Sequence, residues 1–149
     1  MNKPAYPFTV SDDALDYSFE SISEEKVIAK SIRFNPFRAN PIVYNMALVD
    51  VQDDGTTNDS VVSNNRDMPT VLATVTNVLL IFFERYPRKL VYFSGNDEQG
   101  YRNRLYRIVI SCELDKAIEL FEIYGQLPNK SIEEFRINQP YKAFIFQKR

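Results

Sequence analysis

Hydrophobic and polar positions alternate in two neighbouring segments near the start of the chain. Residues 17–23 and 26–34 both repeat with a period of two, which is the spacing of a strand with one buried face. In the second segment, one face carries Ile28, Lys30, Ile32 and Phe34. Because Glu24 and Glu25 leave room only for a tight turn, the two segments predict an antiparallel hairpin.

A helical period replaces the strand period further along the chain. Apolar side chains recur at intervals of three and four between Val71 and Tyr86, which predicts an amphipathic helix that covers one face of a sheet. Asp67 is predicted to cap the start of this helix, and Pro69 suits its first turn. Pro87 is expected to end it.

Shorter patterns predict the remaining elements. Residues 1–16 are interpreted as an arm with a turn of helix, and residues 52–60 as a polar loop. A second helix is expected to begin between Asp97 and Arg102 and to end near Ser111. Further strands and a short helical piece are expected at residues 42–51, 89–94, 115–120 (helical), 121–124 and 141–147.

The order of these elements, β-β-β-α-β-α-β-β, is typical of an α+β protein. It predicts a two-layer sandwich in which two main helices cover one face of a mixed, mostly antiparallel sheet. A length of 149 residues is that of one domain with a sizeable core, so residues 1–149 are expected to form a single domain.

Composition excludes several classes of function. Without any histidine, the chain has no Ser-His-Asp or Cys-His machinery and no His-ligated zinc, and its single cysteine allows no cysteine-based metal cluster. No metal site and no cofactor are predicted, and the catalytic residues of any enzyme stay unknown, since it would have to rely on carboxylates, Tyr, Lys, Arg or a cofactor. A net charge of -2 argues against a dedicated nucleic-acid binder but leaves a local basic patch open.

With no signal peptide and no membrane-length apolar run, a cytoplasmic location without membrane association is expected.

The segment from Ser94 to Ile110 looks most like a binding site. A predicted strand ends at Ser94 and Gly95, where backbone N–H groups could meet an anion, and Arg102, Arg104 and Arg107 would add guanidinium donors. Between Arg85 and Arg107, six basic residues exceed two acidic ones by four charges. The favoured alternative is a polar helix face whose arginines pair with acidic strands.

Three further features have both a functional and a structural interpretation. Residues 50–55 resemble the start of a calcium loop, but Gln52 and Val61 replace expected ligands, so a hairpin or loop tip is favoured. An acidic run is expected to be a solvated rim: Asp12, Asp13, Asp16, Glu20, Glu24 and Glu25. Tyr92, Tyr101 and Tyr106 could stack on bases or donate protons, although packing is the favoured role.

Four segments together resemble a bacterial family of small proteins of unknown function. They are Tyr17-x-Phe19-x-Ser21, Ser63 to Asp67 with Val71 to Val75, Arg102-x-Arg104-Leu105-Tyr106-Arg107, and Phe121 to Gly125. The likeness covers nearly the whole chain. It implies a shared fold and supplies no reaction.

Three hypotheses for function follow. The first is a non-catalytic interaction module that binds a protein partner or itself, supported by the missing catalytic machinery and by strand edges expected to be exposed. The second is a phosphate-bearing ligand or nucleic acid at Arg102, Arg104 and Arg107. The third is a transferase-type enzyme that acts on an anionic substrate without histidine.

Overall fold

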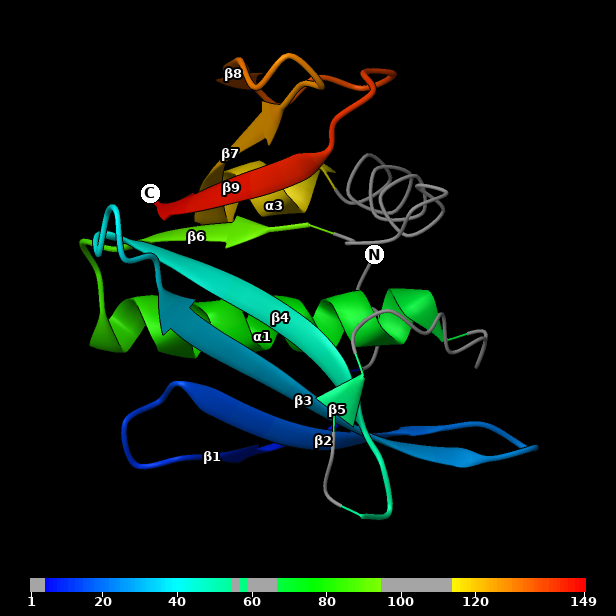
Figure 1. The fold of residues 1–149 in the computed structure, drawn as a ribbon. Coiled ribbons are helices and arrows are strands. Elements are labelled where there is room, and N and C mark those ends of the chain that lie inside the picture. Colours follow the sequence, from blue (N-terminus) through cyan, green and yellow to red (C-terminus); the bar gives the residue numbers. More distant parts are fainter. Residues whose placement is uncertain (1–4, 55–56, 59–66, 95–113) are drawn as a thin grey trace. The chain divides into compact units, whose positions relative to one another are not determined.

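The computed structural model describes residues 5–54, 57–58, 67–94 and 114–149 (Figure 1). The chain divides into a first unit, residues 1–35 and 47–87, and a second unit, residues 36–46 and 88–149. Strand β4 (Val43–Val51) contributes its first half to the second unit and its second half to the first. Helices and a mixed sheet make the protein α+β, as predicted.

Strands β2 and β3 form the predicted hairpin in the first unit. They pair antiparallel over their whole overlap, from Asp16 opposite Arg33 to Ile22 opposite Val27. The strand order in this unit is β1-β2-β3-β4, and β5 pairs with the end of β4. The bounds of the other strands are β1 Thr9–Val10, β2 Asp16–Ile22, β3 Val27–Pro36 and β5 Thr57–Asn58.

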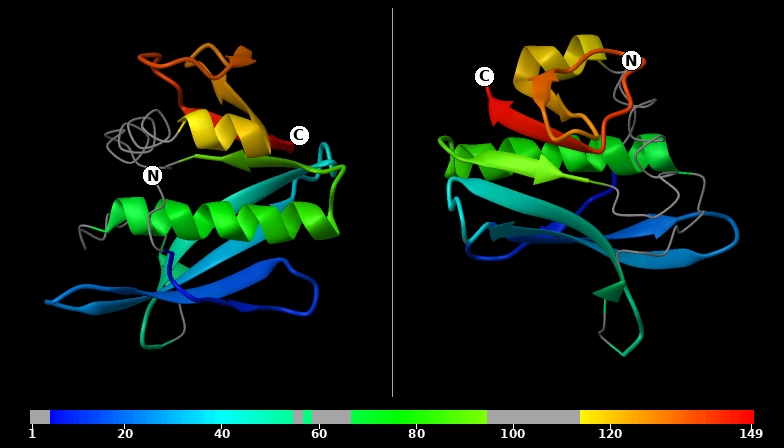
Figure 2. Two further views of the ribbon diagram at one scale, coloured as in Figure 1. Left: turned by 180° about the vertical axis from the view of Figure 1, so that it is seen from behind. Right: turned by 45° about the horizontal axis from the view of Figure 1, so that its top comes forward.

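Helix α1 (Met68–Arg85) lies along one face of this hairpin (Figures 1 and 2). The alternation in β2 and β3 directs Tyr17, Phe19, Ile32 and Phe34 to the core, where all four are buried. The Phe34 ring stacks on Phe82 of the helix with 4.2 Å between ring centroids. The helix adds five more buried apolar side chains of its predicted stripe, Val71, Val75, Val78, Leu79 and Phe83. The core of the first unit is therefore the one the periodicity predicted.

The second unit has the strand order β4-β6-β9-β7-β8. β4 and β6 are parallel, from Val43 opposite Leu90 to Met46 opposite Phe93, and the other pairs are antiparallel. The short predicted helical piece is α3 (Leu114–Leu120), which contacts β7. The bounds of the strands are β6 Leu90–Phe93, β7 Phe121–Gln126, β8 Ile132–Glu134 and β9 Ala143–Lys148.

Tyr141 packs across β7 at Gly125. Its ring is 1% exposed and occupies the space that a Cβ atom on Gly125 would need. The Tyr141 hydroxyl accepts a hydrogen bond from the Arg136 backbone N–H at 2.9 Å and donates one to Glu133 Oε2 at 2.7 Å. Because the hydroxyl is held on both sides, the ring cannot move away without breaking these contacts.

Most strand and helix predictions are confirmed, with local differences. The predicted turn of helix in residues 1–16 is wrong over the described part, which contains the short strand β1 and a turn. Strand β5 interrupts the loop predicted at residues 52–60. The residues predicted to form a second main helix, which was expected to end near Ser111, lie outside the described residues.

No helix in the described part of the chain is long and apolar enough to cross a membrane.

The Gly125→Ala substitution is predicted to lower the free energy of unfolding by about 1 to 3 kcal/mol, because overpacking forces side chains or backbone out of place. Denaturant unfolding measures this loss. In a Tyr141→Ala background the same substitution should cost much less, since the ring that blocks the Cβ is gone. An equal cost in both backgrounds would contradict the proposed clash.

Candidate functional site

The segment that the sequence singled out is described only at its first residue. Ser94 directly follows β6 and is half-buried. Gly95, Arg102, Arg104 and Arg107 lie outside the described residues, as do Tyr101 and Tyr106. The anion site at this segment therefore stays a prediction.

Tyr92 is the one tyrosine of the three candidates that the structure describes. Its hydroxyl donates a hydrogen bond to Gln126 Oε1 at 3.0 Å, and the Phe37 ring packs edge-on against it at 5.5 Å. Burial raises the pKa of the Tyr92 phenol, which disfavours proton release. These contacts support the packing role that the sequence favoured.

The loop that resembles a calcium site is a hairpin. Asp50 lies in β4 opposite Asn58 of β5, which confirms the structural interpretation. Its carboxylate accepts a 2.6 Å charged hydrogen bond from Lys30 Nζ. No group of three or more potential metal ligands occurs in the part of the chain that the structure describes.

Lys30 is the charged member of an otherwise apolar face of β3. Its side chain is 7% exposed and lies opposite Phe19 in the cross-strand register. A buried ammonium loses much of its hydration, so its pairing with Asp50 offsets a large desolvation cost. A buried lysine can also act in catalysis. Here the direct ion pair favours a structural role.

The strongest polar cluster lies where α1 begins. Asp67 is the N-cap residue of α1, as predicted, but its carboxylate makes no hydrogen bond to the helix backbone. Asp67 Oδ2 instead accepts a hydrogen bond from the Tyr6 hydroxyl at 2.6 Å and another from the Ser21 hydroxyl. Two hydroxyls from distant parts of the sequence compete with the helix for this carboxylate.

Tyr6 holds the amino-terminal arm to the same place. Its backbone N–H donates to Thr74 Oγ1 at 2.9 Å, and its ring stacks on Phe19 with centroids 5.8 Å apart. Its hydroxyl also accepts a hydrogen bond from the Ile22 backbone N–H at 3.2 Å. Burial, and next the hydrogen bond to Asp67, raise the pKa of the Tyr6 phenol.

This cluster joins three segments but does not form a catalytic triad. Ser21 is fully buried, and its hydroxyl points its proton at a carboxylate that already accepts from Tyr6. A nucleophilic serine needs a base free to take its proton and access to a substrate. The arrangement is suited to holding the arm, β2 and α1 together.

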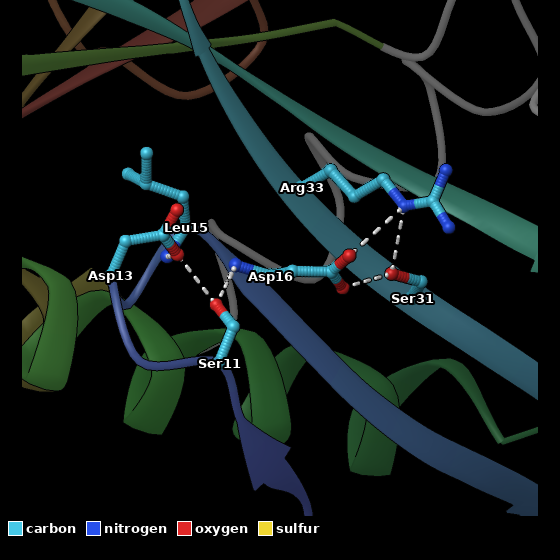
Figure 3. A network of polar contacts seen from close by, with 6 residues as sticks. All are labelled: Ser11, Asp13, Leu15, Asp16, Ser31 and Arg33. Atoms are coloured by element: carbon cyan, nitrogen blue, oxygen red, sulfur yellow. Dashed lines mark hydrogen bonds and ion pairs between the residues drawn. The ribbon is translucent and has the colours of Figure 1, made fainter.

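A second polar network covers part of the opposite face of the hairpin (Figure 3). Asp16 accepts a 2.7 Å hydrogen bond from the Ser31 hydroxyl and forms a 3.5 Å ion pair with Arg33 Nε. In the preceding turn, hydrogen bonds from Ser11 and from the Leu15 N–H lower the pKa of Asp13. Part of the predicted acidic rim is therefore held by internal hydrogen bonds.

Tyr17 carries a buried polar atom without a partner. Its side chain is 0% exposed, and its hydroxyl has no hydrogen-bond partner among the described residues. Burial raises the pKa of Tyr17 to about 12. The hydroxyl is thus a net cost to the folded state, and the neutral form is the one the core retains.

Sequence reasoning missed the residues that organise the Asp67 cluster. Ser21 gave a signal, because it occupies a core-facing position in the alternation of β2 and is the polar member of that row. Tyr6 gave none, since its role depends on long-range contacts between the arm and residues 67 and 74.

The Tyr17→Phe substitution is predicted to raise the free energy of unfolding at neutral pH by about 1 kcal/mol, because it removes an unpaired buried hydroxyl. The folded pKa of about 12 exceeds the ordinary value of 10.0. Loss of the phenol proton is therefore penalised in the folded state, so the wild-type chain keeps its full stability below pH 10 and loses stability as the pH rises through 12. The Phe variant has no phenol at this position and should lose less stability in that range.

Denaturant unfolding between pH 7 and pH 12 measures both effects. Tyr141→Phe is the matched control, because its hydroxyl makes hydrogen bonds and its loss should destabilise the protein. A clear loss of stability in Tyr17→Phe at pH 7 would show that its hydroxyl does have a partner.

Comparison with known proteins bears on family and not on activity. No curated protein and no solved structure matches the chain. A family model described as a family of unknown function, DUF6934, matches residues 2–149, which is nearly the whole chain. The chain therefore belongs to DUF6934, a family of unknown function.

Proposed function

We propose that the protein is an interaction module that binds a protein partner through the end of the β2–β3 hairpin. This surface, the hairpin tip, comprises Ile22, Val27 and the charged residues around them, Glu20, Glu24, Glu25 and Lys26. The observation that carries the proposal is the exposure of Ile22 and Val27, which are 55% and 57% exposed.

The two side chains form one apolar surface. Ile22 and Val27 are directly opposite each other in the hairpin register, and the loop between them is the far end of a two-stranded ribbon (Figures 1 and 2). Cross-strand neighbours have Cβ atoms about 5 Å apart, so a partner could cover both at once. Burial of such surface contributes about 25 cal/mol per Å².

Side-chain recognition is favoured over strand addition. The end strands of the order, β1 and β8, have two and three residues respectively. Short edge strands present few backbone groups to another chain, and proteins use them to prevent edge-to-edge pairing. The exposed edges expected from the sequence are therefore poor support for association, whereas the exposed apolar pair is better support.

The internal use of polar groups also favours binding over catalysis. In the described residues, the carboxylates of Asp67, Asp50 and Asp16 each accept hydrogen bonds from side chains of the same chain. Such groups are committed to the folded structure. The exposed apolar pair has no comparable internal role.

A photocrosslinking amino acid in place of Ile22 is predicted to capture a defined protein in the cells that make this chain. Mass spectrometry of the crosslinked peptides identifies the captured segment. The control places the crosslinker at Asn77, on the exposed side of α1. The product at position 22 should disappear when Val27→Asp is added.

Capture at position 22 no stronger than at position 77, or unaffected by Val27→Asp, would end this proposal. Circular dichroism of the purified variants checks that the substitutions leave the fold intact.

A further inference from the structure

The chain itself carries a surface that complements the hairpin tip. We propose that the partner of the tip is a second copy of this chain, bound at a basic apolar surface in the second unit. This basic apolar surface comprises Phe37, Arg38, Ile42, Arg88 and Lys89. The inference rests on the proposed function and names the partner of the same site.

Two short segments of the second unit build the basic apolar surface. The Leu90 backbone N–H donates to the Ile42 carbonyl oxygen at 2.9 Å, and Lys89 Nζ donates to the Pro41 carbonyl oxygen at 3.5 Å. These bonds place residues 41–42 beside residues 89–90. The Phe37 backbone N–H donates to the Val43 carbonyl oxygen at 3.0 Å, which holds Phe37 beside the first residue of β4.

Apolar side chains are exposed on this surface as they are on the tip. Ile42 is 53% exposed, and Phe37 is 37% exposed while its ring packs edge-on against Tyr92. Each of the two surfaces therefore offers a pair of large apolar side chains. A pair from one copy can cover a pair from another, which removes both from water.

The charges around the two apolar pairs have opposite signs. On the tip, Glu20, Glu24 and Glu25 give -3 and Lys26 gives +1, a sum of -2. On the other surface, Arg38, Arg88 and Lys89 give +3. Lys89 Nζ lies 5.8 Å from the centroid of the Tyr44 ring.

None of these seven charged side chains takes part in an ion pair within the described residues, where the ion pairs involve other groups. The charges are thus available to a partner. Opposite charges around an apolar centre guide association and penalise partners of the wrong sign.

The association is heterologous, because the tip of one copy meets a different surface of the next. One copy of a bound pair then keeps a free tip and the other keeps a free basic apolar surface, so further copies can add at both ends. Self-association should therefore grow with protein concentration and weaken as salt screens the charges.

Sedimentation velocity of the purified full chain tests this inference. The wild-type chain is expected to form larger species as its concentration rises, and to return toward monomer in high salt. The tip reversal Glu20→Lys, Glu24→Lys, Glu25→Lys should weaken self-association about a hundredfold or more, since like charges then meet. The surface reversal Arg38→Glu, Arg88→Glu, Lys89→Glu should do the same.

Mixing the two reversed chains gives the sharpest result. The tip-reversed chain keeps the basic apolar surface and the surface-reversed chain keeps the acidic tip, so the mixture should associate although neither chain does alone. The matched control, Asp53→Lys, Glu84→Lys, Glu119→Lys, makes the same change in charge at exposed positions elsewhere and should associate like the wild type.

A wild-type chain that stays monomeric at every concentration, or a mixture that does not associate, would overturn the inference. If the crosslinker at position 22 still captured a different protein, the proposed function would stand with another partner. If it captured nothing above the Asn77 control, the proposed function itself would fail.

Discussion

One carboxylate oxygen, Oδ2 of Asp67, joins three segments of the first unit. It accepts hydrogen bonds from Tyr6 in the amino-terminal arm and from Ser21 in β2, at the residue where α1 begins. A charged acceptor makes stronger hydrogen bonds than a neutral one, most of all where water is excluded. The start of α1 is thereby fixed over β2, and the apolar stripe of the helix follows onto the core-facing row of the hairpin.

Periodicity predicted the parts of this fold that depend on burial alone. The hairpin, the stripe of α1 and the final strands follow from which side chains must leave water, and local sequence encodes that choice. Asp67 shows where such reasoning stops. Its position at the helix start was predictable. Whether its carboxylate binds the helix backbone or two hydroxyls depends on Ser21 and Tyr6, which lie 46 and 61 positions earlier in the sequence. Strands β1 and β5 have two residues each, too few to show a period.

The candidate site was less predictable than the fold. Arginine clustering drew attention to Arg102, Arg104 and Arg107, which lie outside the described residues. The hairpin tip gave a weaker signal, because Ile22 and Val27 look like ordinary strand residues until the register places them on the face away from α1. Asp50, in the segment that resembles a calcium loop, is paired with Lys30. The internal pairing of these polar groups and the exposure of Ile22 and Val27 together support a binding role for the hairpin tip.

The Asp67 cluster is a scaffold rather than an active site, and a thermodynamic cycle on unfolding is the sharpest test of this role. Ser21→Ala and Tyr6→Phe should each lower the free energy of unfolding by about 1 to 3 kcal/mol, and should cost far less in an Asp67→Ala background. Asp53→Ala, at an exposed position, should change little. If Asp67→Ala left the stability unchanged and the other two effects simply added, the carboxylate would not hold the fold and the claim would be wrong.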